Sequence, residues 1–218
     1  MRIVDLSQPV HAGMQVYPGD PEVAVTPAAT LDRDGVNVLA VHSGSHTGTH
    51  VDAPFHVLAD GARLDELDLA LFHGPAVTAD LLGRAPRTAV RWADLEPVAD
   101  RLRAGVVLVL HTGWSVHFGT PAYLEHPWLT PDAAERLVAT GVRALAVDTL
   151  NPDPTPPLGT GIGDLPVHRA VLGAGGVIVE NLTNVAQLAT LSDPLLSFFP
   201  LHLAGADGAP VRAVGLGT

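Results

Sequence analysis

Histidines are concentrated in one short segment of the sequence, and their spacing is typical of a metal site. Within residues 42–56 of the 218-residue chain lie four of its 11 histidines, where even spacing would place fewer than one. They are His42, His46, His50 and His56. From position 46 to 56 every histidine, and Asp52 with them, occupies an even position. In an extended chain this alternation puts imidazoles and carboxylate on one face and packing residues on the other.

The distance between His46 and His50 requires a bend in that strand. At ~3.3 Å per residue the two side chains would be about 13 Å apart on a straight strand, too far to share one ion. Gly48 lies midway and can supply the bend. A helix would also bring the pair together, but Thr-Gly-Thr is a weak helix former and Pro54 follows closely. We therefore expect a strand that turns at Gly48. A solvated sheet face with no ligand role is the alternative.

The composition narrows the chemistry further. The chain has no cysteine, and all 12 of its basic residues are arginine. This excludes thiolate zinc sites, cysteine nucleophiles, Schiff-base lysines and the Walker-A loop. The formal charge of −11 disfavours nucleic acid and anionic membranes as partners. No apolar run reaches the length of a membrane span and no signal peptide is evident, so the cytoplasm is the expected compartment.

Apolar strands that alternate with helices predict an α/β protein whose mixed sheet is partly covered by helices. Length and the lack of repeats predict a single domain over residues 1–218. The expected strands are residues 3–6, 23–26, 36–42, 106–111, 144–147, 177–180, 198–203 and 211–214. The expected helices are residues 92–103, with Pro97 near the start, residues 131–140 after an N-cap at Thr130, and residues 166–172.

The segment His46-Thr-Gly-Thr-His50-Val-Asp52-Ala-Pro-Phe-His56 resembles the signature of the metal-dependent cyclase family, which includes bacterial kynurenine formamidases and isatin hydrolases. Further matches span nearly the whole chain: Asp5-Leu-Ser near the start, Tyr17-Pro-Gly-Asp20, His168 followed by Glu180, and residues 205–213. The resemblance implies that family's swivelling β/β/α fold.

The resemblance also implies a binuclear site. His46, His50 and Asp52 would hold one metal, Asp52, His168 and Glu180 a second, and His56 would be the general acid/base. Imidazole and carboxylate ligands suit Zn²⁺ or Mn²⁺, two per chain. The residues alone favour a different interpretation, with His168 as a histidine on the surface of a helix and Glu180 as a charge at the end of a strand. Asp207 and Arg212 are expected to form a structural ion pair.

The expected reaction is hydrolysis of an amide C–N bond, in a formamide or a cyclic amide, by a metal-activated water with His56 moving the proton. One alternative is a mononuclear Fe(II) oxygenase with two histidines and one carboxylate. A non-catalytic metal- or ligand-binding module is another.

Three aromatic residues are candidates for binding a small-molecule amide substrate: Tyr17, Phe55 and Trp114. Two departures from the formamidase pattern bear on that substrate: Tyr17 stands where those enzymes usually carry tryptophan, and Asn181 follows Glu180 where they have glycine. The resemblance further implies a homodimer or higher homo-oligomer.

Overall fold

A computed structural model describes all residues from Met1 to Thr218. The strands are β1 (Arg2–Asp5), β2 (Ala24–Ala29), β3 (Val38–His42), β4 (His50–Asp52), β5 (His73–Asp80), β6 (Ala89–Val90), β7 (Val107–His111), β8 (Trp128–Leu129), β9 (Ala144–Val147), β10 (Val177–Glu180), β11 (Leu195–Ser197), β12 (Gly208–Pro210) and β13 (Val214–Gly217). The α-helices are α1 (Leu31–Asp34), α2 (Trp92–Leu95), α3 (Pro131–Ala139), α4 (Pro166–Gly173) and α5 (Val185–Leu188). Short 3-10 helices span Pro54–His56, Leu64–Glu66, Leu69–Phe72, Glu96–Arg101, Trp114–His117 and Pro121–Glu125.

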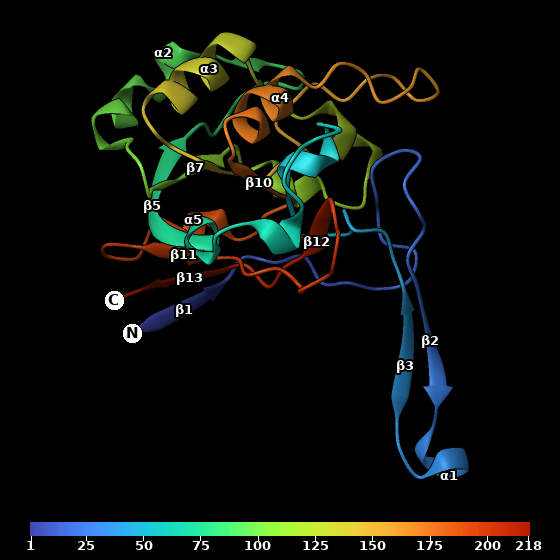
Figure 1. The fold of residues 1–218 in the computed structure, drawn as a ribbon. Helices are drawn as coiled ribbons and strands as arrows, with labels where there is room; N and C mark the ends of the chain where they lie inside the picture. Colours follow the sequence, from blue (N-terminus) through green and yellow to red (C-terminus); the bar gives the residue numbers. More distant parts are fainter.

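A nine-stranded mixed sheet forms the body, in the order β1-β13-β11-β5-β7-β9-β10-β4-β12. Strands β5, β7, β9 and β10 are parallel, and antiparallel strands extend the sheet at both ends. Helices α2, α3 and α4 cover one face (Figure 1). The sheet curls around a second core on its other face. Helix α5 packs into this core, and β1 and β13 form the curled end of the sheet. The predicted mixed α/β architecture is confirmed.

Local signals placed several elements correctly. β9 and β10 have the predicted bounds, and Thr130 caps α3 by accepting a hydrogen bond from the Ala133 backbone N–H, with Pro131 as the first helical residue. Proline lacks the N–H that an α-helix needs, and the predicted helix over 92–103 accordingly changes to a 3-10 helix at Glu96, one residue before Pro97.

Other strands differ from the predictions. The strand expected over 198–203 is wrong, because the ladder with β5 and β13 uses Leu195–Ser197 instead. The last strand begins at Val214, where the expected one ended. β5 was missed because Gly74 and Pro75 obscure its start. Gly74 is needed there, since a Cβ would lie 2.4 Å from the Gly105 carbonyl oxygen.

A hairpin arm, formed by β2, α1 and β3, projects from the body (Figure 1). All five residues of β3 are exposed. No helix of the structure is long and apolar enough to act as a bilayer span; the longest, α3, has nine residues.

Candidate metal centre

The predicted ligand segment bends at Gly48, as expected. Gly48 has a φ of +62°, in the left-handed region that favours glycine, and the chain then enters β4. His50 and Asp52 project from one face of β4, while Val51 between them packs into the core behind the sheet. The bend brings the rings of His46 and His50 to a centroid distance of 5.0 Å. The alternation therefore places His50 and Asp52 on one face of the strand and Val51 in the core, as predicted.

His46, His50 and Asp52 form a first group of converging ligand atoms. Asp52 Oδ1 lies 2.8 Å from His46 Nδ1 and 3.2 Å from His50 Nε2. All three offer a ligand atom within 4.8 Å of the others. Asp52 is completely buried on β4, the second strand from one edge of the sheet, which is flanked by β10 and β12. This rigid position fixes the carboxylate between the two imidazoles.

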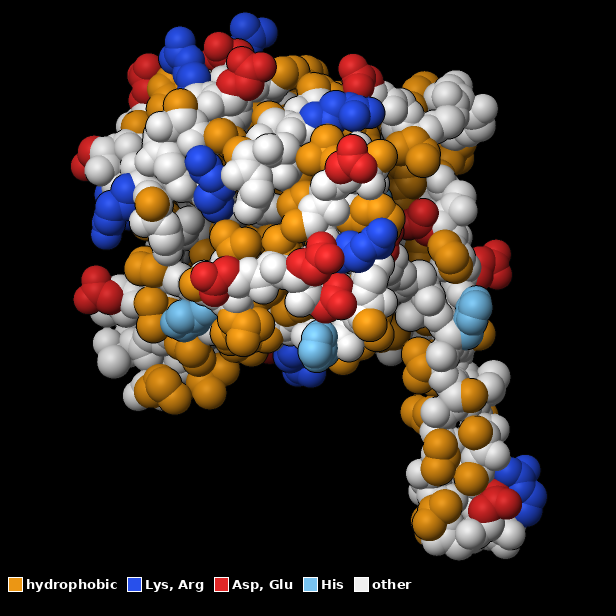
Figure 2. Space-filling view, viewed as in Figure 1, with side chains coloured by type: hydrophobic (Ala, Val, Ile, Leu, Met, Phe, Trp, Pro, Cys, Tyr) orange, Lys and Arg blue, Asp and Glu red, His pale blue; other side chains and the backbone are white.

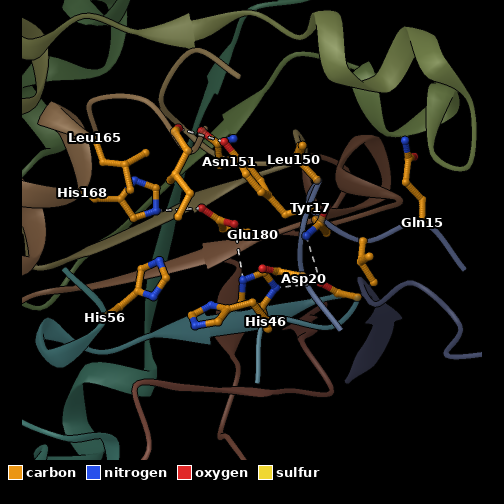
Figure 3. A pocket seen from close by; sticks show the side chains of 15 residues that line it. Gln15, Tyr17, Asp20, His46, His56, Leu150, Asn151, Leu165, His168 and Glu180 are labelled. Carbon is orange, nitrogen blue, oxygen red and sulfur yellow. Dashed lines mark hydrogen bonds and ion pairs between the residues drawn. The ribbon is translucent and has the colours of Figure 1, made fainter. Parts of the chain in front are cut away.

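A second group is formed by Asp52, His168 and Glu180. His168 extends from α4, and Glu180 ends β10, which pairs with β4 so that Glu180 lies opposite His50. His168 Nε2 lies 3.4 Å from Asp52 Oδ2 and 3.1 Å from Glu180 Oε1. Figure 3 shows the imidazole and this carboxylate facing each other. Asp52 thus belongs to both groups, one oxygen facing each.

The site contains buried polar atoms without hydrogen-bond partners, and they fit a bound cation. His50 Nε2, Asp52 Oδ2 and Glu180 Oε1 are fully buried and none has a hydrogen bond of acceptable geometry. Leaving such groups unpaired in the interior is costly, so native sites satisfy them by other means. The donor set of three imidazoles and two carboxylates matches the ligands preferred by divalent ions such as Zn²⁺ or Mn²⁺.

The carboxylates control the protonation of the imidazoles. Burial alone would lower the pKa of His50, but Asp52 and Glu180 outweigh it and raise that pKa to about 10. Burial would also lower the pKa of His46, but the hydrogen bonds to Asp207 and Asp52 outweigh it and raise that pKa to about 9. Burial would raise the pKa of Asp52, yet His50 and His168 hold it well below its usual value. Without a cation, the site therefore binds protons near neutral pH.

Metal binding should consequently release protons and weaken as the pH falls. An imidazole binds metal only when its ligating nitrogen is deprotonated, and the raised pKa values keep these imidazoles protonated below about pH 9 in the metal-free protein. For each proton displaced we expect the affinity to fall by about tenfold per pH unit between pH 8 and 6. Competition with a chelator, corrected for the chelator's own protonation, measures this. A flat affinity profile would contradict the assignment of these imidazoles as ligands.

Asp153 orients His168, a role that the sequence does not predict. Its Oδ2 accepts hydrogen bonds from His168 Nδ1 at 2.6 Å and from the His168 backbone N–H at 3.0 Å, and its Oδ1 accepts one from the Val167 N–H at 2.9 Å. Because Nδ1 donates to Asp153, Nε2 is the nitrogen that faces Asp52 and Glu180. In the sequence this aspartate stands between two prolines, a pattern that is equally typical of a turn.

The expected ion pair between Asp207 and Arg212 is wrong. Arg212 pairs with Asp5 on the surface, at 2.7 Å. Asp207 instead belongs to the site, where its Oδ2 accepts a hydrogen bond from His46 Nε2 at 3.0 Å and lies 3.8 Å from His56 Nδ1. The turn after residue 205 carries Asp207 beside β4, and this contact over 161 residues left no local sequence signal.

His56 lies beside both ligand groups but belongs to neither of them. It ends a 3-10 helix that begins at Pro54, two residues after β4. Its ring lies 4.1 Å from that of His46 and 5.7 Å from that of His168, by centroid distance. About a quarter of the side chain is exposed, at 27%. With His46 and Asp207 it also forms a further group of possible ligands, so its role as acid/base stays a prediction.

One cavity opens directly onto these groups. His46, His50, His56, His168 and Glu180 line it, together with apolar side chains that include Leu150, Ile162 and Leu165 (Figure 3). Tyr17 lines it as predicted, and its hydroxyl donates a hydrogen bond to the Ile162 carbonyl at 3.1 Å. Asp20 lines it too, and burial raises the pKa of its carboxyl.

The other two predicted substrate contacts do not line this cavity. Phe55 lies 4.0 Å beneath the Arg63 guanidinium. Trp114 is buried against Tyr123 and Leu150, and its indole N–H donates to the Ala122 carbonyl. Both aromatic rings are therefore used in packing.

The chain is similar in sequence and in structure to known proteins. A family model described as "Putative cyclase" matches residues 4–154. The chain is 34% identical to a kynurenine formamidase of Salinibacter ruber, over 98% of this chain and 97% of that protein. It is 32% identical to one of Delftia acidovorans, over 98% and 96%. The structure resembles isatin hydrolase A from Ralstonia solanacearum with a TM-score of 0.85 and 25% identity, covering 100% of this chain and 92% of that one.

Proposed function

This chain belongs to the cyclase family and is a metal-dependent amide hydrolase, and from that premise we propose that it cleaves the C–N bond of an N-aryl amide. Kynurenine formamidases act on a formylated arylamine and isatin hydrolases on a cyclic aryl amide, so an amide nitrogen attached to an aromatic ring is common to both. The apolar cavity wall beside the ligand groups suits such a ring.

The observation that supports this proposal most directly is the position of Asp52. Its two oxygens face separate ligand groups, and unpaired buried atoms surround it. We propose that His46, His50 and Asp52 hold one Zn²⁺ or Mn²⁺ and that Asp52, His168 and Glu180 hold a second. The oxygenase alternative uses only three ligands and would give His46 and Glu180 no role. When bound, the metal ions would supply an activated water and polarise the amide carbonyl.

The chain's own residues would provide orientation and proton transfer. Tyr17, Ile162 and Leu165 would hold the aromatic part of the substrate against the cavity wall. His56, beside both groups, would accept a proton from the attacking water and return it to the leaving nitrogen. Asp207 would hold His46 through its hydrogen bond to Nε2, and it lies 3.8 Å from His56 Nδ1.

Metal analysis combined with a substrate panel tests the proposal. We expect two equivalents of Zn²⁺ or Mn²⁺ per chain, and turnover of N-formylkynurenine, other formanilides or isatin without a cosubstrate under anaerobic conditions. Because Tyr17 replaces tryptophan, the preferred aryl amide need not be N-formylkynurenine. Loaded protein that leaves every aryl amide intact would favour a binding module, and a requirement for O₂ would favour the oxygenase. The single domain and the cytoplasmic location stay predictions.

We further propose that the protein is a homodimer or a higher homo-oligomer, in which the arm β2–α1–β3 contacts a second copy. An isolated two-stranded hairpin is marginally stable in water. This one nevertheless exposes a run of large apolar side chains, visible in Figure 2. They are Leu31, Val36, Val38, Leu39 and Val41, each about half or more exposed. A surface of this kind is typical of an interface.

Two charges on the arm should therefore separate the copies. In the double variant Leu39→Asp/Val41→Asp, the carboxylates would have to be desolvated in the interface, so we expect a monomer at micromolar concentration. Light scattering coupled to size exclusion measures the mass. The matched variant Leu69→Asp/Leu82→Asp changes two leucines that are exposed on the body and should leave the mass unchanged. An arm variant that keeps the wild-type mass would refute the arm as the contact.

A further inference from the structure

Asn181 has an unusual backbone conformation for a buried residue. It follows Glu180 directly at the end of β10 and has a φ of 59°, in the left-handed region that asparagine tolerates better than most residues. Its backbone N–H donates to the Thr149 carbonyl at 3.0 Å, and its carbonyl accepts a hydrogen bond from Thr49 Oγ1 at 2.8 Å. With both backbone groups held, the side chain has a defined direction.

That side chain connects the ligand turn to a distant segment. Asn181 Nδ2 donates to the Gly48 carbonyl at 3.0 Å, and Asn181 Oδ1 accepts a hydrogen bond from the Tyr123 hydroxyl at 2.9 Å. The same Gly48 carbonyl accepts a hydrogen bond from His50 Nδ1 at 2.8 Å. Tyr123, Asn181 and His50 are all buried, and His50 and Asn181 also line the cavity beside the ligand groups.

The Gly48 carbonyl determines which nitrogen of His50 can bind a metal. While Nδ1 donates to this oxygen, Nε2 is left to face Asp52 and Glu180. Glycine is the most flexible residue of the ligand segment, and Gly48 has no side chain of its own to hold the carbonyl. The second hydrogen bond, from Asn181, supplies that constraint.

Tyr123 fixes the amide of Asn181 in turn. The Gly48 oxygen can only accept, so Nδ2 must point toward it and Oδ1 away from it. Oδ1 would then be buried and unpaired without the Tyr123 hydroxyl. The three contacts form a continuous path from the 3-10 helix of Tyr123 to the imidazole of His50.

We propose that Asn181 is a positioning residue that orients His50 for metal binding through the Gly48 carbonyl, and that Tyr123 acts through Asn181. The proposal rests on the metal-dependent function given above. Asn181 is also the residue at which the chain departs from the Glu-Gly sequence of the formamidase pattern. Glycine at position 181 would remove the hydrogen bond that Asn181 Nδ2 donates to the Gly48 carbonyl.

Asn181→Gly tests the proposal without straining the backbone, because glycine adopts a φ near +60° readily. We expect the dissociation constant for Zn²⁺ or Mn²⁺, measured by chelator competition, to rise about 10- to 100-fold, as is usual for the loss of a partner behind a ligand. The control is Asn184→Gly, at an exposed asparagine that also has a positive φ, of 55°, and whose side chain donates to the Asp5 carbonyl. Metal affinity should be unchanged in that variant.

Tyr123→Phe completes a double-mutant cycle. It keeps the ring and removes only the hydroxyl, so we expect a smaller loss of metal affinity than in Asn181→Gly. The double variant should lose no more than Asn181→Gly alone, because Tyr123 acts through the amide. Additive losses would overturn the relay, and so would an Asn181→Gly protein with wild-type affinity, even if its melting temperature fell. Wild-type protein that binds no metal would instead refute the proposed function.

Discussion

Asp52→Asn is expected to abolish both metal binding and hydrolysis. The substitution keeps the shape of the side chain but removes the negative charge that faces His46 and His50 through Oδ1 and His168 through Oδ2. An amide nitrogen in place of either oxygen would point N–H groups at a cation. Since losing an outer partner of a ligand costs roughly 10- to 100-fold in affinity, losing the carboxylate common to both groups should cost more than that. Metal analysis after desalting and an aryl-amide hydrolysis assay measure the two effects.

Asp68→Asn is the matched control for this change. Asp68 caps a 3-10 helix by accepting a hydrogen bond from the Ala70 backbone N–H and belongs to neither ligand group. Its variant should keep wild-type metal content and turnover. If Asp52→Asn retained two equivalents of metal, the assignment of Asp52 to both groups would be wrong. If it retained one, Asp52 would be a ligand of a single ion, and the two groups could be separated by testing Glu180→Gln next.

The sequence predicts best those features of the site that arise within one short segment of the chain. Alternation over positions 46–56 specifies which side chains share a face, and glycine at 48 specifies where the strand must bend. These follow from backbone geometry within one segment. The resemblance to the family supplied His168 and Glu180, whose own surroundings in the sequence are equally compatible with a surface helix and a strand end.

Contacts between distant segments were not predictable in this way. Asp207 reaches His46 across 161 residues, and Asp153 reaches His168 from a proline-flanked loop. In isolation Asp153 is typical of a turn, and Asp207 is expected to pair with Arg212. The same limit applies to the fold: β5 begins with a glycine that is required by the close approach of Gly105, a contact that appears only after the sheet has assembled.

Most of the aromatic residues expected at the substrate site lie elsewhere in the structure. Of the three aromatic residues expected to bind substrate, Tyr17, Phe55 and Trp114, only Tyr17 lines the cavity. In a chain with 5% aromatic residues, most rings are needed to fill volume in the core. Trp114 has that function beside Tyr123. Phe55 packs under the Arg63 guanidinium although it lies within the ligand segment, so a ring's place in the sequence does not predict whether it lines the cavity.

His56→Ala should separate catalysis from metal binding. His56 lies outside the two groups that meet at Asp52, and its partly exposed ring borders the cavity. Removing a general acid/base typically costs about 10²- to 10⁴-fold in rate, and we expect kcat to fall within that range. Metal content should stay at the wild-type value, because His50, Asp52, His168 and Glu180 are unchanged. Added imidazole should restore part of the activity, since the cavity left by the side chain is open to solvent.

The control for His56→Ala is His202→Ala, which removes an exposed histidine outside the ligand groups and should leave kcat unchanged. The informative outcome is a His56→Ala protein that has lost metal. His56, His46 and Asp207 also form a possible ligand group, so such a loss would place an ion there and make His56 a ligand. If the variant instead keeps its metal and has a reduced kcat, His56 is the acid/base. The loss of kcat should then be smaller for substrates whose leaving arylamine is more acidic, because a better leaving group depends less on being protonated by His56.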